Sequence, residues 1–249
     1  MEPIEVVRQG NVALLRMRGG KANAMNIRLL EALEARLEDV DDADAVAITG
    51  DGSAFSAGLA LPELIELDRE GMAELISTFE RVMRRVLAFP RATVAAINGH
   101  AYAGGCVLGL MCDVRVMAAG PAQIGLDEIQ LGIGLPSIVI EPLRVRVAPA
   151  LHGIVALEGR TFLPDDALRI GLVDEVVAGD RLIARALEIA ASRAVAPIAY
   201  AQIKRALLAP VLTACDRRRE SDRETWLESW FSDHAQKTLR AAVDRITRR

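Results

Sequence analysis

Segments with the pattern of buried strands alternate with helical segments through the first half of the chain, and this alternation limits the fold more than any other feature. Runs rich in small and β-branched residues occupy 45–49, 93–97 and 114–118. Apolar residues recur at helical spacing over 27–40 and 71–89. Strands that alternate with helices are typical of α/β proteins, so we expect an α/β fold.

The beginning of the chain carries a different pattern. Residues 4–8 and 12–17 are short strand-like runs separated by Gly10 and Asn11, which is a turn signal, so we expect an N-terminal hairpin. Asn26 directly precedes the first helical segment and is a suitable N-cap, because its side-chain oxygen can accept a hydrogen bond from the first turn.

The second half of the chain is predicted to be nearly all helical from residue 137 onward. Near residue 195 helices with charged faces begin to dominate, and we divide the chain there into a core, residues 1–195, and a C-terminal helical region, residues 196–249. Three aromatic residues of this region are interpreted as core or subunit-contact surface, in preference to the alternative of a ligand-binding set: Trp226, Trp230 and Phe231.

The composition excludes several classes of function. The chain has 249 residues, 51% of them apolar, and a formal net charge of -4 without the basic face that nucleic acid would need. No uninterrupted apolar stretch is long enough to cross a membrane, and no targeting segment is recognised at the N-terminus. The three cysteines lack the spacing of a disulfide framework or a metal site. We therefore expect a cytoplasmic protein with no nucleic-acid or membrane partner and no bound metal.

Two adjacent glycines, Gly104 and Gly105, stand where an apolar helix is expected to begin, in the segment NGHAYAGGCVLGLMCD. At a helix start, unpaired backbone N–H groups and the positive end of the helix dipole point outward, which suits developing negative charge. The alternative is that the glycines only allow close packing of the helix. A glycine pair alone favours this alternative.

A similar turn stands at Gly58 and Leu59, in the segment AFSAGLALPEL. Turns in successive strand–helix units can converge, so the N–H groups of Leu59 and Gly104 are candidates for an oxyanion hole. Each such donor typically stabilises a transition state by roughly 2.7–4 kcal/mol. Taken alone, this turn would also be interpreted as a packing turn.

An acidic pair, Asp127 and Glu128, interrupts the apolar segment QIGLDEIQLGIGL. Apolar surroundings would raise the pKa of a carboxyl by desolvation, and a raised pKa suits a general base near neutrality. The alternative, a surface turn with two hydrated acids, is equally supported by these residues. We expect Asp127 to face water.

The three segments, in this order, resemble the motifs of the enoyl-CoA hydratase/isomerase (crotonase) superfamily over nearly the whole chain. The resemblance implies a spiral of ββα units, a C-terminal helical trimerisation region, and a homotrimer or hexamer acting on an acyl-CoA thioester. It also implies that Leu59 and Gly104 supply the oxyanion N–H groups and that no cofactor is needed beyond the CoA of the substrate. Positions that correspond to those around the adenine of CoA in the family are Ala22, Ala57 and Leu61. Lys21 is expected near the CoA phosphates, and the alternative, which is favoured for a loop lysine, is that it is solvated.

The resemblance is greatest to the monofunctional 3-enoyl to 2-enoyl-CoA isomerases. Hydratases of the family hold water between two glutamates, but here Val107 replaces the first, and Glu128 corresponds to the second. One carboxylate still suffices to move a proton from C2 to C4 through an enolate, which is isomerisation. The alternatives are a hydratase or another crotonase-type reaction, and a catalytically silent acyl-CoA-binding subunit, suggested by Val107 and by Ala60 where the family usually has aspartate.

Overall fold

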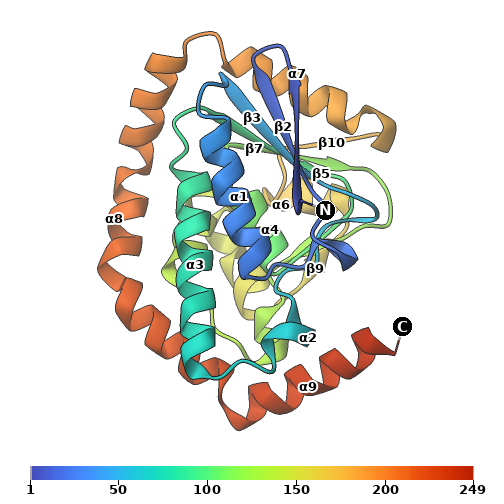
Figure 1. The fold of residues 1–249 in the computed structure, drawn as a ribbon, viewed down its shortest axis with the longest axis vertical. Helices are drawn as coiled ribbons and strands as arrows, with labels where there is room; N and C mark the ends of the chain where they lie inside the picture. The colour runs from blue at the N-terminus through green and yellow to red at the C-terminus, as the bar shows by residue number, and fades with distance from the viewer. Residues whose placement is uncertain (1, 249) are drawn as a thin grey trace.

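The computed structural model describes residues 2–248 and contains a large twisted sheet, covered on both faces by helices (Figure 1). The first two strands form the predicted antiparallel hairpin, and every other neighbouring pair in this sheet is parallel. In spatial order its strands are β1 (Ile4–Gln9), β2 (Val12–Met17), β3 (Ala45–Gly50), β5 (Ala92–Ile97), β7 (Val114–Ala118) and β10 (Glu175–Val177).

A second, smaller sheet is built from strands that directly follow those of the large sheet. Strands β3, β5 and β7 lead into β4, β6 and β8, and a helical segment follows each pair, so the chain repeats a ββα unit. This confirms the expected α/β class with a crotonase-like spiral. The small sheet has the order β4 (Ala54–Ser56), β6 (His100–Tyr102), β8 (Ile124–Gly125) and β9 (Thr161–Phe162).

Side chains of the large sheet alternate between two apolar cores. Val46 and Ile48 of β3 contribute to the larger core, whereas Ala45 and Ala47 contribute to the smaller core beneath α7. Because both faces are buried, the central strands have continuous apolar sequences rather than alternating ones. The helices are α1 (Ile27–Asp39), α2 (Leu61–Leu64), α3 (Arg69–Leu87), α4 (Gly104–Met111), α5 (Ser137–Arg146), α6 (Pro164–Ile170), α7 (Leu182–Arg193), α8 (Pro197–Trp230) and α9 (Asp233–Thr247).

Side-chain caps fix where the first long helices begin. The Asn26 side chain accepts a hydrogen bond from the Leu29 N–H at 3.0 Å, which confirms the predicted cap of α1. Asp68 caps α3 in the same way through the Gly71 N–H, at 2.9 Å. Helix α3 therefore begins at Arg69, two residues before the start predicted from the apolar spacing.

The prediction of a nearly all-helical second half is wrong in two places. Strand β9 pairs antiparallel with β8, and β10 pairs parallel with β7. These strands have two and three residues, respectively. Runs this short carry no measurable period, so the sequence pattern cannot indicate them.

Helix α8 begins at Pro197 and runs along the outside of the molecule before the chain turns into α9, which crosses one end (Figure 1). Leu208 and Trp230 of α8 and Leu239 of α9 belong to the larger core. The predicted aromatic stripe is therefore partly core, with Trp230 fully buried. The division at residue 195 stays a prediction.

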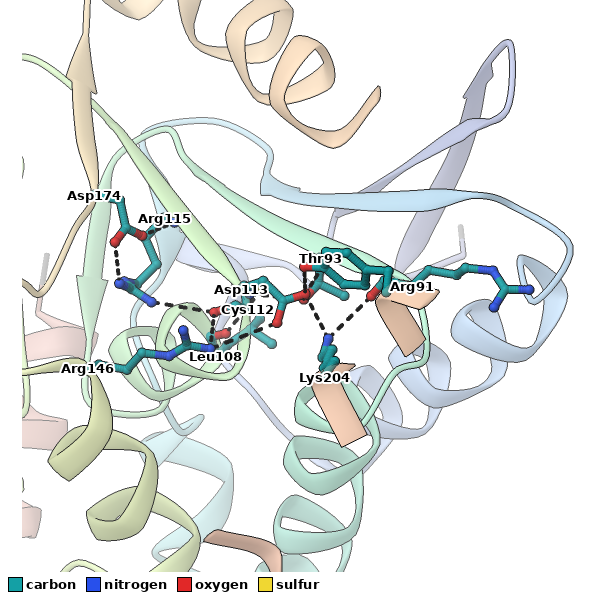
Figure 2. A network of polar contacts seen from close by, with 10 residues as sticks. Arg91, Thr93, Leu108, Cys112, Asp113, Arg115, Arg146, Asp174 and Lys204 are labelled. Carbon is teal, nitrogen blue, oxygen red and sulfur yellow. Dashed lines mark hydrogen bonds and ion pairs between the residues drawn. The ribbon is translucent and has the colours of Figure 1, made fainter. Parts of the chain in front are cut away.

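Polar contacts join α8 to the large sheet (Figure 2). Lys204, only 6% exposed, donates a hydrogen bond to Asp113 at 2.8 Å and one to the Arg91 carbonyl at 3.3 Å. Asp113, at the start of β7, also accepts hydrogen bonds from the Thr93 N–H at 3.0 Å and the Tyr200 hydroxyl at 2.9 Å. Four donors thus converge on one carboxyl where α8 meets the sheet, counting the Thr93 hydroxyl at 3.2 Å.

Candidate active site

A cavity of about 380 Å³ lies where β4, β6 and β8 end. The ββα repeat explains its position, because each unit delivers its strand-to-helix turn to the same side of the small sheet. The wall is largely apolar and includes Leu61, Ile76, Phe79, Leu131, Val139 and Trp226. Such a cavity suits a ligand with an apolar chain and few polar groups.

The turn after β4 contributes Leu59 to the cavity. Gly58 has φ of +84°, a conformation that glycine adopts without strain. Met25 pairs with this turn: its N–H donates to the Gly58 carbonyl at 2.7 Å, and its carbonyl accepts from the Ala60 N–H at 2.9 Å. In this parallel bridge the N–H of Leu59 points away from Met25, so the bridge leaves it unused.

The turn after β6 contributes Gly104, the first residue of α4. Its N–H is one of those at a helix start that have no acceptor within the helix. The preceding residue, Ala103, has φ of +45°, which is strained for a residue with a side chain, and its N–H is held by the Gly125 carbonyl at 2.9 Å. The Gly104 N–H is therefore presented by a backbone that β8 fixes.

The two turns are in close contact. A Cβ atom added at Gly58 would lie 3.2 Å from the backbone nitrogen of Gly104 and 2.9 Å from the carbonyl oxygen of Tyr102. The N–H groups of Leu59 and Gly104 thus belong to touching segments that line one cavity. Gly105 has the packing role considered as the alternative, because a Cβ there would lie 2.2 Å from the Ser56 carbonyl oxygen.

Glu128 lines the same cavity and begins a short 3₁₀ helix, η2 (Glu128–Leu131), three residues after β8. Its Oε2 atom is buried and has no hydrogen-bond partner in the described chain. The pKa of Glu128 is raised from 4.5 to about 8, mainly by burial; the Glu128 N–H opposes the shift, and the negative charge of Asp127 adds to it. An unpaired carboxyl with this pKa can accept a proton near neutral pH.

The expectation that Asp127 faces water is wrong. Asp127 also lines the cavity, and its Oδ1 atom is buried without a hydrogen-bond partner among residues 2–248. Burial raises its pKa, and the N–H groups of Asp127 and Ala103 partly offset this. Neighbouring residues point in opposite directions along a strand, but here the chain turns into a 3₁₀ helix, so both carboxyls reach the cavity.

The four predicted CoA-binding residues are divided between the cavity and its neighbourhood. Ala57 and Leu61 line it, whereas Ala22 and Lys21 do not. Ala22 has φ of +56°, and its carbonyl accepts the Ala57 N–H at 2.9 Å. The Lys21 ammonium donates to the carbonyl of Ile246 at 3.3 Å, and Ile246 is itself a lining residue.

The C-terminal helices also contribute to the cavity, which the sequence analysis did not predict. Trp226 of α8 and Ala242, Arg245 and Ile246 at the end of α9 complete its wall. Arg245 is the one cationic side chain among the lining residues in the described part of the chain. No local motif marks these residues, because they reach the cavity only through the path of α8 and α9 around the core.

Comparison with known proteins decides the family. The enoyl-CoA hydratase/isomerase family profile matches residues 7–247. The chain belongs to this family. The chain is 35% identical to the 2,3-dehydroadipyl-CoA hydratase of Escherichia coli (strain K12), over 83% of the chain and 82% of that protein. It is 28% identical to the mitochondrial enoyl-CoA delta isomerase 1 of Homo sapiens, over 94% of the chain and 80% of that protein.

A solved structure agrees closely in fold. The crystal structure of human mitochondrial delta3-delta2-enoyl-CoA isomerase superposes with a TM-score of 0.94 at 28% identity, covering 99% of this chain and 98% of that one. Family members thus include both isomerases and hydratases, and the family supports an enzyme that acts on acyl-CoA thioesters.

Residues 2–248 contain neither a membrane-spanning helix nor a cluster of metal-ligating side chains. No helix in this range is long and apolar enough to cross a membrane. No group of three or more histidine, cysteine, aspartate or glutamate side chains in the same range is placed to hold a metal ion.

Proposed function

We propose that this protein isomerises 3-enoyl-CoA to 2-enoyl-CoA through an enolate. The observation that carries the proposal is that Glu128, whose Oε2 atom is buried without a hydrogen-bond partner in the described chain, lines one apolar cavity together with two touching turns, at Leu59 and Gly104. The similarity to the human isomerase supports the same reaction.

In this mechanism the thioester oxygen accepts hydrogen bonds from the N–H groups of Leu59 and Gly104. These hydrogen bonds become stronger as negative charge develops on the oxygen, so they stabilise the enolate more than the substrate. The Glu128 carboxylate removes a proton from C2, and protonation at C4 completes the shift of the double bond. The apolar wall excludes water, which keeps the N–H groups effective and the carboxylate basic.

The residues of α4 argue against the hydratase alternative. Val107 is fully buried in the core and is not among the cavity-lining residues, so α4 supplies no acidic partner for water. The alternative keeps two supports: the Escherichia coli hydratase is a relative, and Asp127 is a second acid in the cavity. A catalytically silent acyl-CoA-binding subunit remains the third candidate.

The CoA part of the substrate is proposed to bind at Ala22, Ala57, Leu61 and Lys21. Support comes from the contact of Lys21 with Ile246 at the end of α9, which brings a cation next to the cavity wall. The proposed reaction needs no other cofactor, because the thioester itself makes the C2 proton acidic.

The deciding experiment is a panel of 3-enoyl-CoA and 2-enoyl-CoA substrates of graded chain length, assayed for isomerisation and hydration together. We expect isomerisation of 3-enoyl-CoA and little hydration of 2-enoyl-CoA. Faster hydration than isomerisation would favour the hydratase. Tight binding without deuterium exchange at C2 would favour the silent subunit.

The variant Gly58→Ala tests whether the two turns together supply the oxyanion N–H groups. The added Cβ would be strained at φ of +84° and would press on Tyr102 and Gly104, moving the two N–H groups apart. We expect kcat to fall by about 10²-fold, as for the loss of one oxyanion donor. Gly52→Ala is the matched control, because Gly52 has φ of +74° but open space around it. Equal activity of both variants would argue against the proposed role of these turns.

We propose further that the protein forms a homotrimer or hexamer in the cytoplasm. The support for assembly is an exposed apolar patch, Val145, Ile203 and Leu207, which are 59%, 54% and 72% exposed around one surface cavity. Patches of this kind commonly mark contacts with another chain. Light scattering is expected to give three or six times the chain mass, and a monomeric mass would contradict the assembly.

A further inference from the structure

Two neighbouring carboxyls, rather than one, lie in the candidate active site. Asp127 and Glu128 both line the cavity, and each has one buried oxygen without a hydrogen-bond partner in the described chain. Structural carboxyls that are buried are usually paired or hydrogen-bonded. Here backbone N–H groups satisfy each carboxyl only in part, so one oxygen of each remains available to a ligand.

No cation neutralises this pair. Neither carboxyl takes part in an ion pair within residues 2–248, and Arg245, the cationic lining residue, bonds to the Ala241 carbonyl instead, at 3.2 Å. Two carboxyls that share a poorly hydrated site resist ionising together, so they lose their protons in two coupled steps. Burial raises the pKa of both groups, and the negative charge of Asp127 adds to the shift of Glu128.

We propose that Asp127 and Glu128 work as a proton-sharing pair, in which one carboxyl removes the C2 proton and the other delivers a different proton to C4. This inference rests on the proposed isomerisation and replaces the single shuttle by two groups. It makes Asp127 a catalytic residue.

The proposed step balances. The ionised carboxyl forms an O–H bond with the hydrogen from C2, and the C–H electrons move into the enolate held by Leu59 and Gly104. The protonated carboxyl then gives its hydrogen to C4, the C2–C3 double bond forms, and the thioester carbonyl is restored. The pair still carries one proton, now on the other carboxyl. Transfer between the carboxyls, or exchange with solvent after product release, restores the starting state.

The variant Asp127→Asn distinguishes a mechanism with one proton-carrying carboxyl from a mechanism with two. A single shuttle returns the hydrogen it removed from C2, whereas a pair supplies C4 with a hydrogen that came from solvent. The measurement is a single turnover, with enzyme in excess, of a 3-enoyl-CoA that carries deuterium at C2, followed by mass spectrometry of the product. We expect nearly no deuterium at C4 with the wild type and most of it retained with Asp127→Asn.

The same variant is expected to lower kcat by about 10²-fold, because one group must then serve both carbons. Asp127→Glu keeps a second carboxyl, so its product should again carry nearly no deuterium at C4, as with the wild type. Asp165 is an exposed acid of α6, and Asp165→Asn is the matched control, expected to have no effect. A merely structural role of Asp127 would lower kcat without moving the label.

Different results would contradict the proton-sharing pair and the isomerase activity. If the wild type isomerises 3-enoyl-CoA but the label at C4 is the same in the wild type and Asp127→Asn, the proton-sharing pair is wrong and the isomerase stands. If the wild type shows no isomerisation, both are wrong.

Discussion

Glu128→Gln is expected to lower kcat for isomerisation by about 10³-fold, the middle of the range for loss of a general base. Glutamine keeps the shape of the side chain but cannot accept the C2 proton. The Leu59 and Gly104 N–H groups and the apolar wall are unchanged, so we expect KM to change little. Steady-state kinetics with one 3-enoyl-CoA substrate provides the measurement.

The pH dependence of the wild type is a further part of this prediction. With the pKa of Glu128 raised to about 8, a single Glu128 shuttle should give a kcat/KM that rises with pH through this range and then levels off. The proton-sharing pair must keep one proton, so its kcat/KM should instead fall as the last proton is lost. The folded state favours the protonated carboxyl, so the wild type should lose stability as pH rises from about 4.5 to about 8 and little more above that, and neutral glutamine should not show this loss. Thermal unfolding at pH 9 then serves as the control for folding. Full turnover by the glutamine variant would remove Glu128 from the mechanism.

The sequence predicted those parts of the site that depend on local backbone chemistry. Gly58 and Gly104 stand in turns whose geometry follows from the strand–helix order, and the structure brings these turns into contact. The cap at Asn26 was predictable for the same reason, because a cap depends on residues three positions apart. Short-range rules therefore located the segments, although they do not give the distance between them.

The parts that the sequence did not predict depend on long-range packing or on an exact turn. Arg245 and Ile246 reach the cavity only because α8 and α9 pass around the core, a path that no local pattern encodes. Asp127 was expected to face water, although the residue next to it was expected to face the site. The 3₁₀ turn that starts at Glu128 changes this direction, and four residues are too few to predict such a turn.

Asp113→Ala is expected to destabilise the fold by about 3–5 kcal/mol, the range for removing one partner of a buried ion pair. The side chains of Lys204 and Asp113 are 6% and 10% exposed, so the remaining ammonium cannot regain its hydration (Figure 2). Of its two hydrogen bonds only the one to the Arg91 carbonyl remains, and the Tyr200 hydroxyl and the Thr93 N–H lose their acceptor. Urea denaturation followed by circular dichroism measures the loss.

Asp216→Ala is the matched control on the same helix. Asp216 pairs with Arg84 and Arg219, but these side chains are 34–45% exposed, so its loss should cost no more than about 1 kcal/mol. A double variant, Asp113→Leu with Lys204→Met, removes both buried charges and is expected to recover most of the stability, since the penalty arises from the unpaired ammonium rather than from the missing pair. A double variant as unstable as Asp113→Ala would instead assign the loss to Thr93 and Tyr200. Because Asp113 does not line the active-site cavity, folded Asp113→Ala should keep its turnover, which separates the attachment of α8 from the chemistry.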